Sequence, residues 1–581
     1  MKVLLSGNEA IAYGAYAAGV KIASGYPGTP STEILEALAK YDEVDSSWAP
    51  NEKVALEVGI GASLGGARTI VTMKHVGLNV AADPLFTLAY TGVNGGLVIV
   101  NADDPSMHSS QNEQDNRYYA KAAKVPMLEP SDSQEAAWLV DEGLKISERF
   151  DIPVILRMTT RINHSKSLVD VDIERAESSR EYEKDVRKYV MIPAYARQRR
   201  NSLDQRLEAL AEFSEEFPGN RVEWGSRGIG FIADGVSYQY VKEVFPEASV
   251  LKITMVHPLP KRMISDFVGQ IEKVIVVEEL DPFIEDQLKA WGLPVVGKRL
   301  IPGIGELNPE AIRAGVLGDA DAQASLTAVD DIPARPPMMC AGCPHRGVFY
   351  IFKKMKLMVT GDIGCYTLGV APPLEAMDTC FCMGASIGNA MGFQKATGRK
   401  DVVAVIGDST FMHSGITPLV DVVYNKGIVT VVILDNRTTA MTGRQDHPGT
   451  GKTLKGDAGV EVDIEKLVRG LGVASVRVID PYDLIAVRAA ITEEIAKDEP
   501  SVIIFRRACL LAEKVTAEPL MVIDECDSCK ACMRLGCPAL SWESDRARIE
   551  PSQCIGCDVC GQVCKAGAIV KYEQADQGAG I

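Results

Sequence analysis

One stretch of the chain, Asp401 to Asn436, constrains the fold around it more than any other. Its first apolar run, VVAVI, is rich in β-branched residues and is typical of a buried strand in a parallel sheet. That strand ends at Gly407-Asp408-Ser409, and a helix is predicted from Ser414 to Lys426 with Gly427 as its stop. A second apolar run, IVTVVIL, leads to Asp435-Asn436 at the same carboxyl edge, where open α/β sheets bind ligands. Oxygen ligands at two adjacent strand ends, beside a helix N-terminus, suit a divalent metal that holds a diphosphate.

The spacing of these polar residues resembles the thiamine diphosphate motif, which is written GDG followed about two dozen residues later by NN. Ser409 stands in place of the second Gly of that motif, and Asp435 stands in place of its first Asn. The two residues that the resemblance assigns to Mg²⁺, Asp408 and Asn436, are both present, and Gly407 and Ser409 are assigned to the cofactor. The alternative is an ordinary βαβ unit with an Asp in its loop.

The C-terminal tail carries a second strong pattern, because eight of the fourteen Cys lie between Cys526 and Cys564. Thiolates at CxxCxxC spacing fold round [4Fe–4S] cubes, and the fourth Cys of each run ligates the other cluster. Zinc fits less well, since no His lies nearby. A gap of four residues before Cys537, where three is usual, leaves that loop's geometry open. The expected ligand sets are Cys526, Cys529, Cys532 and Cys564 for one cluster, and Cys554, Cys557, Cys560 and Cys537 for the other.

Length and composition narrow the class of protein. A chain of 581 residues is too long for one core and is expected to hold about four domains. The net charge of −17 argues against nucleic acid as a partner. No apolar run reaches the roughly 18 residues of a membrane helix, and the N-terminus lacks a signal-peptide pattern. We therefore expect a cytoplasmic protein without a membrane partner, whose Cys serve metal sites rather than disulfides.

The predicted fold class is multidomain α/β. We expect two thiamine-diphosphate domains (pyrimidine and diphosphate), a middle βαβ domain similar to the transketolase C-terminal domain, and a small α+β ferredoxin domain of bacterial type. The predicted segments are 1–170 (pyrimidine domain), 171–225 (charged helical linker), 226–330 (middle domain), 331–514 (diphosphate domain) and 515–581 (two-cluster ferredoxin domain). The linker is interpreted as solvated helices that join two domains.

Thiamine diphosphate also needs a carboxylate at its aminopyrimidine ring, which a diphosphate domain cannot supply alone. The first domain offers Glu52, and its spacing to Gly61-Ala62 resembles that in 2-oxoacid:ferredoxin oxidoreductases. Glu57 is the competing residue, although its helical position favours a packing or surface role. The alternative for Glu52 is a solvated acid at a helix start.

Further segments resemble the same family. The stretch Tyr26 to Thr32 is similar to its YPxTPS signature, which implies that Thr29 lies near the substrate carbonyl and carboxylate. The alternative is a Pro-rich turn in which Ser31 or Thr32 caps the next helix. Arg117 ends a polar segment after a strand, and we weigh a bidentate clamp on a 2-oxoacid carboxylate equally against a surface ion pair.

The loop after Asn436 is similar to the family's xMTGxQ loop. The resemblance implies that Thr438 offers Mg²⁺ a backbone carbonyl and that Met441 and Thr442 contact the cofactor. Two earlier segments, CAGC and GDIGC, resemble those that hold a cluster near the cofactor in related enzymes. A possible third [4Fe–4S] set is therefore Cys340, Cys343, Cys365 and Cys509, with buried structural Cys as the alternative. Cys380 and Cys382 match no ligand position.

Taken whole, the chain resembles the alpha subunits of indolepyruvate:ferredoxin oxidoreductases, with KHVGLN, CAGCPHR and MTGRQDHPGTG carrying the resemblance. It implies oxidative decarboxylation of aryl-2-oxoacids such as indolepyruvate and phenylpyruvate. The products are an aryl-acetyl-coenzyme A, CO₂ and reduced ferredoxin, and the cofactors are thiamine diphosphate, Mg²⁺ and [4Fe–4S] clusters. A beta subunit, in an α2β2 assembly, is the implied partner. Two alternatives stay open: a related oxidoreductase acting on another 2-oxoacid, and an iron–sulfur electron-transfer subunit that has lost its thiamine diphosphate site.

Overall fold

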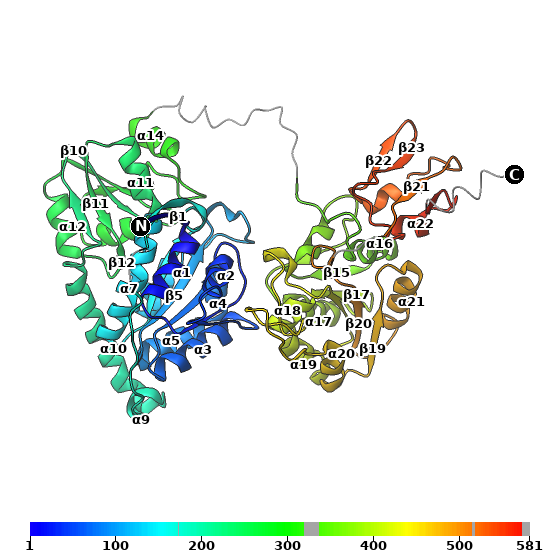
Figure 1. The fold of residues 1–581 in the computed structure, drawn as a ribbon, viewed down its shortest axis with the longest axis horizontal. Helices are drawn as coiled ribbons and strands as arrows, with labels where there is room; N and C mark the ends of the chain where they lie inside the picture. The colour runs from blue at the N-terminus through cyan, green and yellow to red at the C-terminus, as the bar shows by residue number, and fades with distance from the viewer. Residues whose placement is uncertain (172–173, 319–335, 514–516, 572–581) are drawn as a thin grey trace. The chain divides into compact units, whose positions relative to one another are not determined.

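The computed structural model describes residues 1–171, 174–318, 336–513 and 517–571. The chain divides into two compact units, Met1–Ile332 and Pro333–Ile581, each of which has its own sheets (Figure 1). The predicted boundaries near 330 and 514 lie at residues 319–335 and 514–516, outside the described residues. Within the described part of the chain, no helix combines the length and apolar character needed to span a bilayer.

A seven-stranded sheet with the order β12-β6-β7-β5-β4-β2-β3 forms the centre of the N-terminal unit. Its strands are parallel, except that β12 runs antiparallel to β6. The central strands β4 (Thr69–Lys74), β5 (Leu97–Asp103) and β7 (Val154–Thr159) are buried along their whole length. They contain the predicted runs TIVTMK, LVIVNAD and VILRM, whose continuous apolar character suits strands covered on both faces.

Helices and short strands complete this first domain. The strand β1 (Lys2–Ser6) pairs antiparallel with β8 (Lys166–Asp170) as a separate ribbon. The helix α1 packs against α7 and α2. The other elements are α1 (Gly7–Ala17), β2 (Ile22–Gly25), α2 (Thr32–Leu38), β3 (Asp45–Trp48), α3 (Glu52–Leu64), α4 (His75–Val80), α5 (Ala82–Thr91), α6 (Arg117–Ala123), β6 (Met127–Leu128), α7 (Ser133–Phe150) and α8 (Thr160–His164).

The middle segment forms a five-stranded sheet, β14-β13-β10-β11-β9, and also sends β12 (Met255–His257) into the first sheet. This shared strand explains why the first and middle domains form one compact unit. Phe231, Val250 and Ile275 lie in the core on this second sheet. The elements are β9 (Arg221–Glu223), β10 (Ser226–Asp234), α11 (Gly235–Val244), β11 (Ala248–Ile253), α12 (Lys261–Val268), β13 (Lys273–Val277), α13 (Phe283–Ala290), β14 (Val295–Val296) and α14 (Pro309–Leu317).

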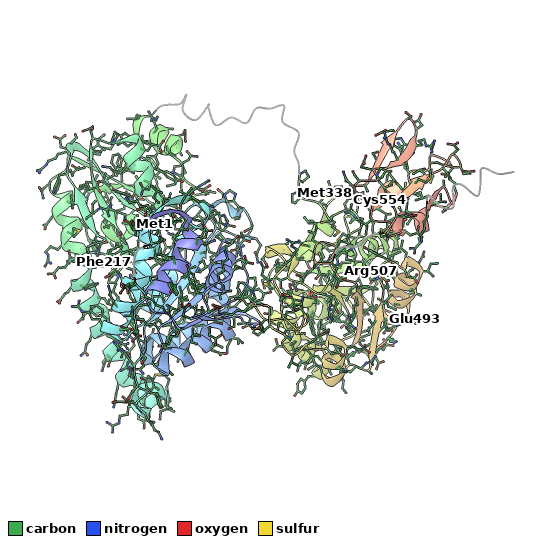
Figure 2. All side chains as sticks on the ribbon, in the orientation of Figure 1. Met1, Phe217, Met338, Glu493, Arg507 and Cys554 are labelled. Atoms are coloured by element: carbon green, nitrogen blue, oxygen red, sulfur yellow. The ribbon has the colours of Figure 1, made fainter. Side chains whose placement is uncertain are left out.

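The charged segment between these sheets contains α9 (Val186–Tyr189) and the long helix α10 (Pro193–Ser214). Arg206 and Arg199 of α10 donate to carbonyl oxygens in the last turn of α5, which lack helical partners. Beyond the helix, Phe217 (labelled in Figure 2) stacks on Trp138 with ring centroids 5.7 Å apart. The expectation of solvated linking helices is therefore wrong for α10, which packs on the first domain.

The C-terminal unit holds a six-stranded, fully parallel sheet with the order β16-β15-β17-β18-β20-β19. Its central strands β17 (Val402–Gly407) and β18 (Thr430–Asp435) are the two predicted around the thiamine diphosphate motif. Both strands are buried throughout. The other elements are α16 (His345–Met355), β15 (Met358–Gly361), β16 (Thr379–Cys380), α17 (Ala385–Thr397), α20 (Ile464–Gly470), β19 (Ser475–Ile479), α21 (Leu484–Glu494) and β20 (Ser501–Arg506).

The helical segment between β17 and β18 begins earlier than predicted. It opens with α18 (Asp408–Thr410), passes through a π-helical turn at Phe411–Gly415 and continues as α19 (Ile416–Tyr424). A π-turn lets a helix change register, and such turns occur often at functional sites. The helix also ends before Gly427, and Lys426 takes the left-handed conformation with φ 52°. Asp408 is therefore a helix-start residue rather than a loop residue.

The Cys-rich tail folds into two small antiparallel ribbons, β21 (Leu520–Val522) with β24 (Ile569–Lys571), and β22 (Leu540–Glu543) with β23 (Arg546–Ile549). A short helix, α22 (Val559–Val563), lies between β23 and β24 in sequence. Leu535 and Val559 join the core of the preceding domain, packing with Phe349 and Phe352 of α16. The tail is therefore fixed against the six-stranded domain, and the multidomain α/β prediction is confirmed.

Candidate cofactor and cluster sites

Asp408 joins the two strand ends at the centre of the six-stranded sheet. Its side chain is nearly buried, at 2% exposure. One carboxylate oxygen accepts from the Ser409 N–H at 2.9 Å, and the other accepts from the Arg437 N–H at 2.7 Å. The register of β17 and β18 pairs Gly407 with Leu434, which brings Asn436 to the same edge. Backbone hydrogen bonds from both strand ends thus hold the carboxylate in place.

Asn436 and Thr438 complete this edge. The Asn436 side-chain oxygen accepts from the Thr438 N–H at 3.3 Å, and both residues are buried. A carboxylate, an amide oxygen and a backbone carbonyl form the hard-oxygen donor set that Mg²⁺ prefers. The residues present therefore fit a divalent metal with a diphosphate, and Asp408, Asn436 and the Thr438 carbonyl are the groups that would hold it.

Two histidines, His345 and His447, are hydrogen-bonding neighbours of the metal-binding residues at this edge. The Gly449 N–H donates to His447 Nδ1 at 3.2 Å, which places the ring proton of a neutral His447 on Nε2. That nitrogen lies 3.2 Å from an Asp408 carboxylate oxygen, to which it therefore donates. His345 Nε2 lies 3.4 Å from the Asn436 amide nitrogen, and burial lowers the pKa of His345 to about 4. A His in the HPGTG segment, soon after the cofactor loop, was the only sequence signal for His447.

The two residues that differ from the thiamine diphosphate motif, Ser409 and Asp435, both have hydrogen-bond partners in the structure. Ser409 Oγ lies 2.8 Å from Thr439 Oγ1, so the hydroxyl ties the helix start to the following loop. The Asp435 carboxylate accepts from Arg506 Nε at 2.7 Å on the neighbouring strand β20. Burial and the nearby Asp408 charge raise the pKa of Asp435, and Arg506 opposes that effect. Asp435 therefore belongs to an ion pair across the sheet.

The loop after Asn436 is folded by its own polar groups. Thr442 Oγ1 donates to the Gln445 side-chain oxygen at 2.6 Å, and the Thr439 N–H donates to the Gln445 carbonyl at 2.9 Å. Met441 lies at the outside of this loop with 49% exposure. The loop therefore presents Met441 to solvent while Thr442 is turned toward Gln445.

In the N-terminal unit, Glu52 is the first residue of α3 and follows the N-cap Asn51. It is 5% exposed, and a Cβ at Gly77 of α4 would lie 2.6 Å from its carboxylate. Gly77 thus leaves the space that the Glu52 carboxylate occupies. The competing Glu57 is exposed and pairs with Lys53 on the surface of the same helix. Of the two competing acids, Glu52 is therefore buried and Glu57 is exposed to solvent.

The Thr29 loop follows β2 at the same sheet edge as β4 and β5. Ser31 is the N-cap of α2, but its hydroxyl donates back to the Gly28 carbonyl at 2.9 Å rather than capping the helix. Ser109 Oγ, beyond β5, donates to the Thr29 carbonyl at 3.2 Å. The Lys74 side chain, at the end of β4, lies against Gly28. Three neighbouring strand ends therefore meet around Thr29.

Arg117 is not placed to clamp a substrate, so that interpretation is wrong. The residue is 0% exposed and forms ion pairs with Asp115 at 2.5 Å, Glu278 at 2.6 Å and Asp234 at 2.9 Å. It also donates to the carbonyl of Glu279 at 2.8 Å. These partners come from both sheets of the unit, so the guanidinium joins the first domain to the middle domain. Nothing in the local sequence distinguished this role from a surface pair.

The Cys of the tail line two separate small cavities. Gly536, at φ 64°, turns the chain just before Cys537 and so accommodates the extra residue of the first run. Burial and neighbouring thiols raise the pKa of Cys557 to about 11. One cavity is lined by Cys537, Cys554 (labelled in Figure 2), Cys557 and Cys560, and the other is lined by Cys526, Cys529, Cys532 and Cys564.

These two groups are the two ligand sets expected from the spacing. Among the described residues, no three His, Cys, Asp or Glu side chains converge to hold a single ion. A cube differs from such a site because each of its irons takes one protein thiolate. Because four Cys line each cavity, the residues present fit a cube, which would deprotonate the thiols on binding.

The four Cys of the predicted third set are also neighbours. Burial raises the pKa of Cys343 to about 12, and the nearby Cys340 and Cys365 add to the shift. Burial likewise raises the pKa of Cys365 to about 11, with contributions from Cys509 and Cys340. The Cys509 N–H donates to the Asn436 carbonyl at 2.9 Å, so this group adjoins the metal-binding edge. Cys380 lies elsewhere, with its thiol 3.6 Å from the Asp362 carbonyl.

Two side chains connect this group to the tail. Arg346 donates to the carbonyls of Leu535 and Gly536, at 2.8 and 2.6 Å, and to the Cys340 carbonyl at 3.2 Å. Tyr482 OH donates to the Gly342 carbonyl at 2.5 Å, and its own carbonyl accepts from Gln562 of the tail at 2.7 Å. The CAGC segment is therefore held directly against the two-cavity tail.

Comparison with known proteins agrees with this geometry. Residues 13–207 match the model for the thiamine diphosphate-binding part of pyruvate flavodoxin/ferredoxin oxidoreductases. Residues 362–505 match the model for the C-terminal, cofactor-binding domain of thiamine pyrophosphate enzymes. The second match contains Asp408 and Asn436, and the first contains Glu52 and Thr29. Both units of the chain are thus identified as thiamine diphosphate-binding.

The similar curated proteins extend over almost the whole chain. The indolepyruvate oxidoreductase subunit IorA of Archaeoglobus fulgidus is 42% identical over 98% of this chain and 97% of its own length. The corresponding subunits of Methanothermobacter thermautotrophicus and Pyrococcus horikoshii are each 40% identical, over 98% and 99% of this chain and 97% and 98% of their own lengths. Because the match includes both thiamine diphosphate domains and the Cys-rich tail, the chain belongs to the IorA family of indolepyruvate oxidoreductase subunits.

Proposed function

We propose that this chain catalyses the oxidative decarboxylation of aryl-2-oxoacids, indolepyruvate and phenylpyruvate, to aryl-acetyl-coenzyme A with reduction of ferredoxin. The substrate class is supported by the names of relatives that are about 40% identical along nearly the whole chain. A beta subunit is the proposed partner, since those relatives are named as subunits, and α2β2 is the proposed assembly. The clusters are proposed to carry the electrons singly to ferredoxin.

One observation supports the proposal that decarboxylation is coupled to electron transfer. Cys509, of the proposed third cluster set, is hydrogen-bonded to the backbone of Asn436, a proposed metal ligand. Arg346 and Tyr482 then link the CAGC segment to the tail. Thiol groups therefore continue from the metal-binding edge to the tail cavities within one compact unit. An ordinary thiamine enzyme that does not pass on electrons would have no use for such a series.

The proposed roles of the residues follow from their positions. Asp408, Asn436 and the Thr438 carbonyl bind Mg²⁺, and the helix start at Gly407 and Ser409 receives the diphosphate. Glu52 hydrogen-bonds the aminopyrimidine ring, and Thr29 contacts the substrate. The bound thiamine diphosphate supplies the nucleophilic carbon and the electron sink for loss of CO₂. The further cofactor contacts are assigned to Met441 and Thr442.

The test is turnover by the chain together with its beta partner, purified without oxygen. Coenzyme A-dependent reduction of a viologen dye or of ferredoxin is measured with indolepyruvate, phenylpyruvate and pyruvate in turn. We expect the highest kcat/KM with the two aryl substrates, and no reduction without thiamine diphosphate. A preference for pyruvate would replace the aryl assignment by another 2-oxoacid. Retained electron transfer with no thiamine diphosphate binding would overturn the enzymatic assignment.

A further inference from the structure

Lys74 is a buried cation that the proposed roles leave without a function. It is the last residue of β4, and it is only 8% exposed. Its stem packs against Gly28, where an added Cβ would lie 3.0 Å from the Lys74 Cβ. Thr29, the proposed substrate contact, is the residue after Gly28 in that loop. The amine is therefore held beside the Thr29 loop at the carboxyl edge of the parallel sheet, where such sheets bind ligands.

The ammonium group is tethered but not saturated by its described hydrogen bonds. It donates to the Ser109 carbonyl at 2.6 Å and lies 3.5 Å from the Ser109 hydroxyl. The same hydroxyl donates to the Thr29 carbonyl at 3.2 Å, so the cation, Ser109 and Thr29 form one group. An ammonium has three N–H donors, and this geometry leaves capacity for an incoming acceptor.

Among the residues that the structure describes, no carboxylate forms a close ion pair with the Lys74 ammonium. Asp104 is the acid that acts on it, but that carboxylate accepts from the Ser109 N–H at 2.9 Å, Ser110 Oγ at 2.5 Å and Thr160 Oγ1 at 2.7 Å. His75, the next residue, is buried, and burial lowers its pKa, so the ring is neutral and adds no second positive charge beside Lys74. Burial lowers the pKa of Lys74 to about 8, with Asp104 opposing the shift. A buried cation of this kind gains stability from a bound anion.

We propose that Lys74 binds the carboxylate of the 2-oxoacid substrate, in the role for which Arg117 is excluded by its saturated ion cluster. The proposal rests on the proposed function and names the group that recognises the acid end of its substrate. The Lys74 ammonium donates to a carboxylate oxygen of the substrate. The Ser109 carbonyl holds the ammonium in position, and the Ser109 hydroxyl links it to Thr29. Loss of CO₂ removes the negative charge from this position, so the product is held less tightly than the substrate.

The test compares Lys74→Met, Lys74→Gln and Lys74→Arg in the enzyme assembled with its beta partner. Lys53→Met is the matched control, because that lysine is exposed on α3 and makes a surface pair with Glu57. We expect Lys74→Met and Lys74→Gln to raise the KM for the 2-oxoacid about 10- to 100-fold, the loss expected for one charged hydrogen bond. The KM for coenzyme A and the affinity for thiamine diphosphate stay unchanged. Lys74→Arg restores part of the loss, and Lys53→Met has no effect.

A second measurement uses the unmodified enzyme and so does not depend on how the variants fold. Arylacetate and arylacetamide have nearly the same shape, but the amide lacks the negative charge and has an NH₂ donor in place of one acceptor oxygen. We expect the acid to be the tighter inhibitor against the 2-oxoacid. Equal inhibition by the two compounds, or a normal 2-oxoacid KM in Lys74→Met, would overturn the Lys74 proposal while leaving the proposed function intact. Failure of the unmodified enzyme to oxidise any 2-oxoacid would instead overturn both.

Discussion

Replacing Arg117 by Met tests the interpretation of the buried ion cluster in the N-terminal unit. Arg117 and its partners Asp115, Asp234 and Glu278 are all essentially excluded from water. Removing the cation leaves three buried carboxylates without their shared counter-charge. Breaking a buried ion pair by deleting one partner costs about 3–5 kcal/mol, so we expect the free energy of unfolding to fall by about that amount.

The matched control is Arg161→Met, in which the lost pair also joins the first domain to the middle domain. Arg161 pairs with Glu306 at 2.7 Å, but its side chain is 50% exposed. Exposed pairs of this kind contribute about 0–1 kcal/mol, so this variant should unfold almost as the parent does. Both substitutions remove one guanidinium that joins the same two domains. The comparison therefore measures the combined effect of the burial of Arg117 and its larger number of carboxylate partners.

The destabilisation by Arg117→Met should also depend on pH. Burial already raises the pKa of Glu278 to about 7, and Arg117 opposes that shift. Without the guanidinium, the folded-state pKa of Glu278 rises further above its unfolded value. Protonation then favours the folded state, so the loss of stability should be largest above pH 8 and smaller near pH 5.5.

Urea unfolding of the full chain, followed by tryptophan fluorescence, measures these effects. Trp48, Trp138, Trp224 and Trp291 belong to the N-terminal unit, and only Trp542 lies in the other, so the signal reports mainly on the unit that contains Arg117. If Arg117→Met keeps the parental unfolding midpoint but shows a raised KM for the 2-oxoacid alone, the structural assignment is refuted and the carboxylate clamp is restored.

Three further predictions concern the cofactor and cluster sites. Glu52→Gln should bind thiamine diphosphate as the parent does, measured by calorimetry, but lose about 10²- to 10⁴-fold in kcat; unchanged turnover would contradict the role given to Glu52. His447→Phe should weaken Mg²⁺ binding about 10- to 100-fold by removing the hydrogen bond to Asp408, and normal Mg²⁺ affinity would show that this contact has no such role. Cys509→Ser should lower the iron content by one cube and remove one cluster signal from the paramagnetic resonance spectrum; a parent chain with only two cubes would refute the third cluster.

The sequence alone predicted those structural features that depend on residues close together in the chain. Apolar runs gave the buried strands β17 and β18, since strands covered on both faces need continuous apolar character. The helix start was misjudged because the helix passes through a π-turn, which leaves no mark in local periodicity. The spacing of the eight tail Cys also predicted which of them line each cavity, because two such runs place the fourth Cys of each run with the first three Cys of the other.

The tertiary structure decided the roles that depend on residues far apart in the chain. Arg117 was equally compatible with a substrate clamp until the fold supplied Asp234 and Glu278 from the middle domain. Lys74 opens the KHVGLN segment, which resembles the family but assigned no role to the lysine. Its position beside Thr29 follows from the order in which β2, β4 and β5 lie in the sheet. A side chain's chemistry depends on which of its hydrogen-bond donors are already used. Sheet order and domain contacts determine that, and a local sequence pattern does not contain them.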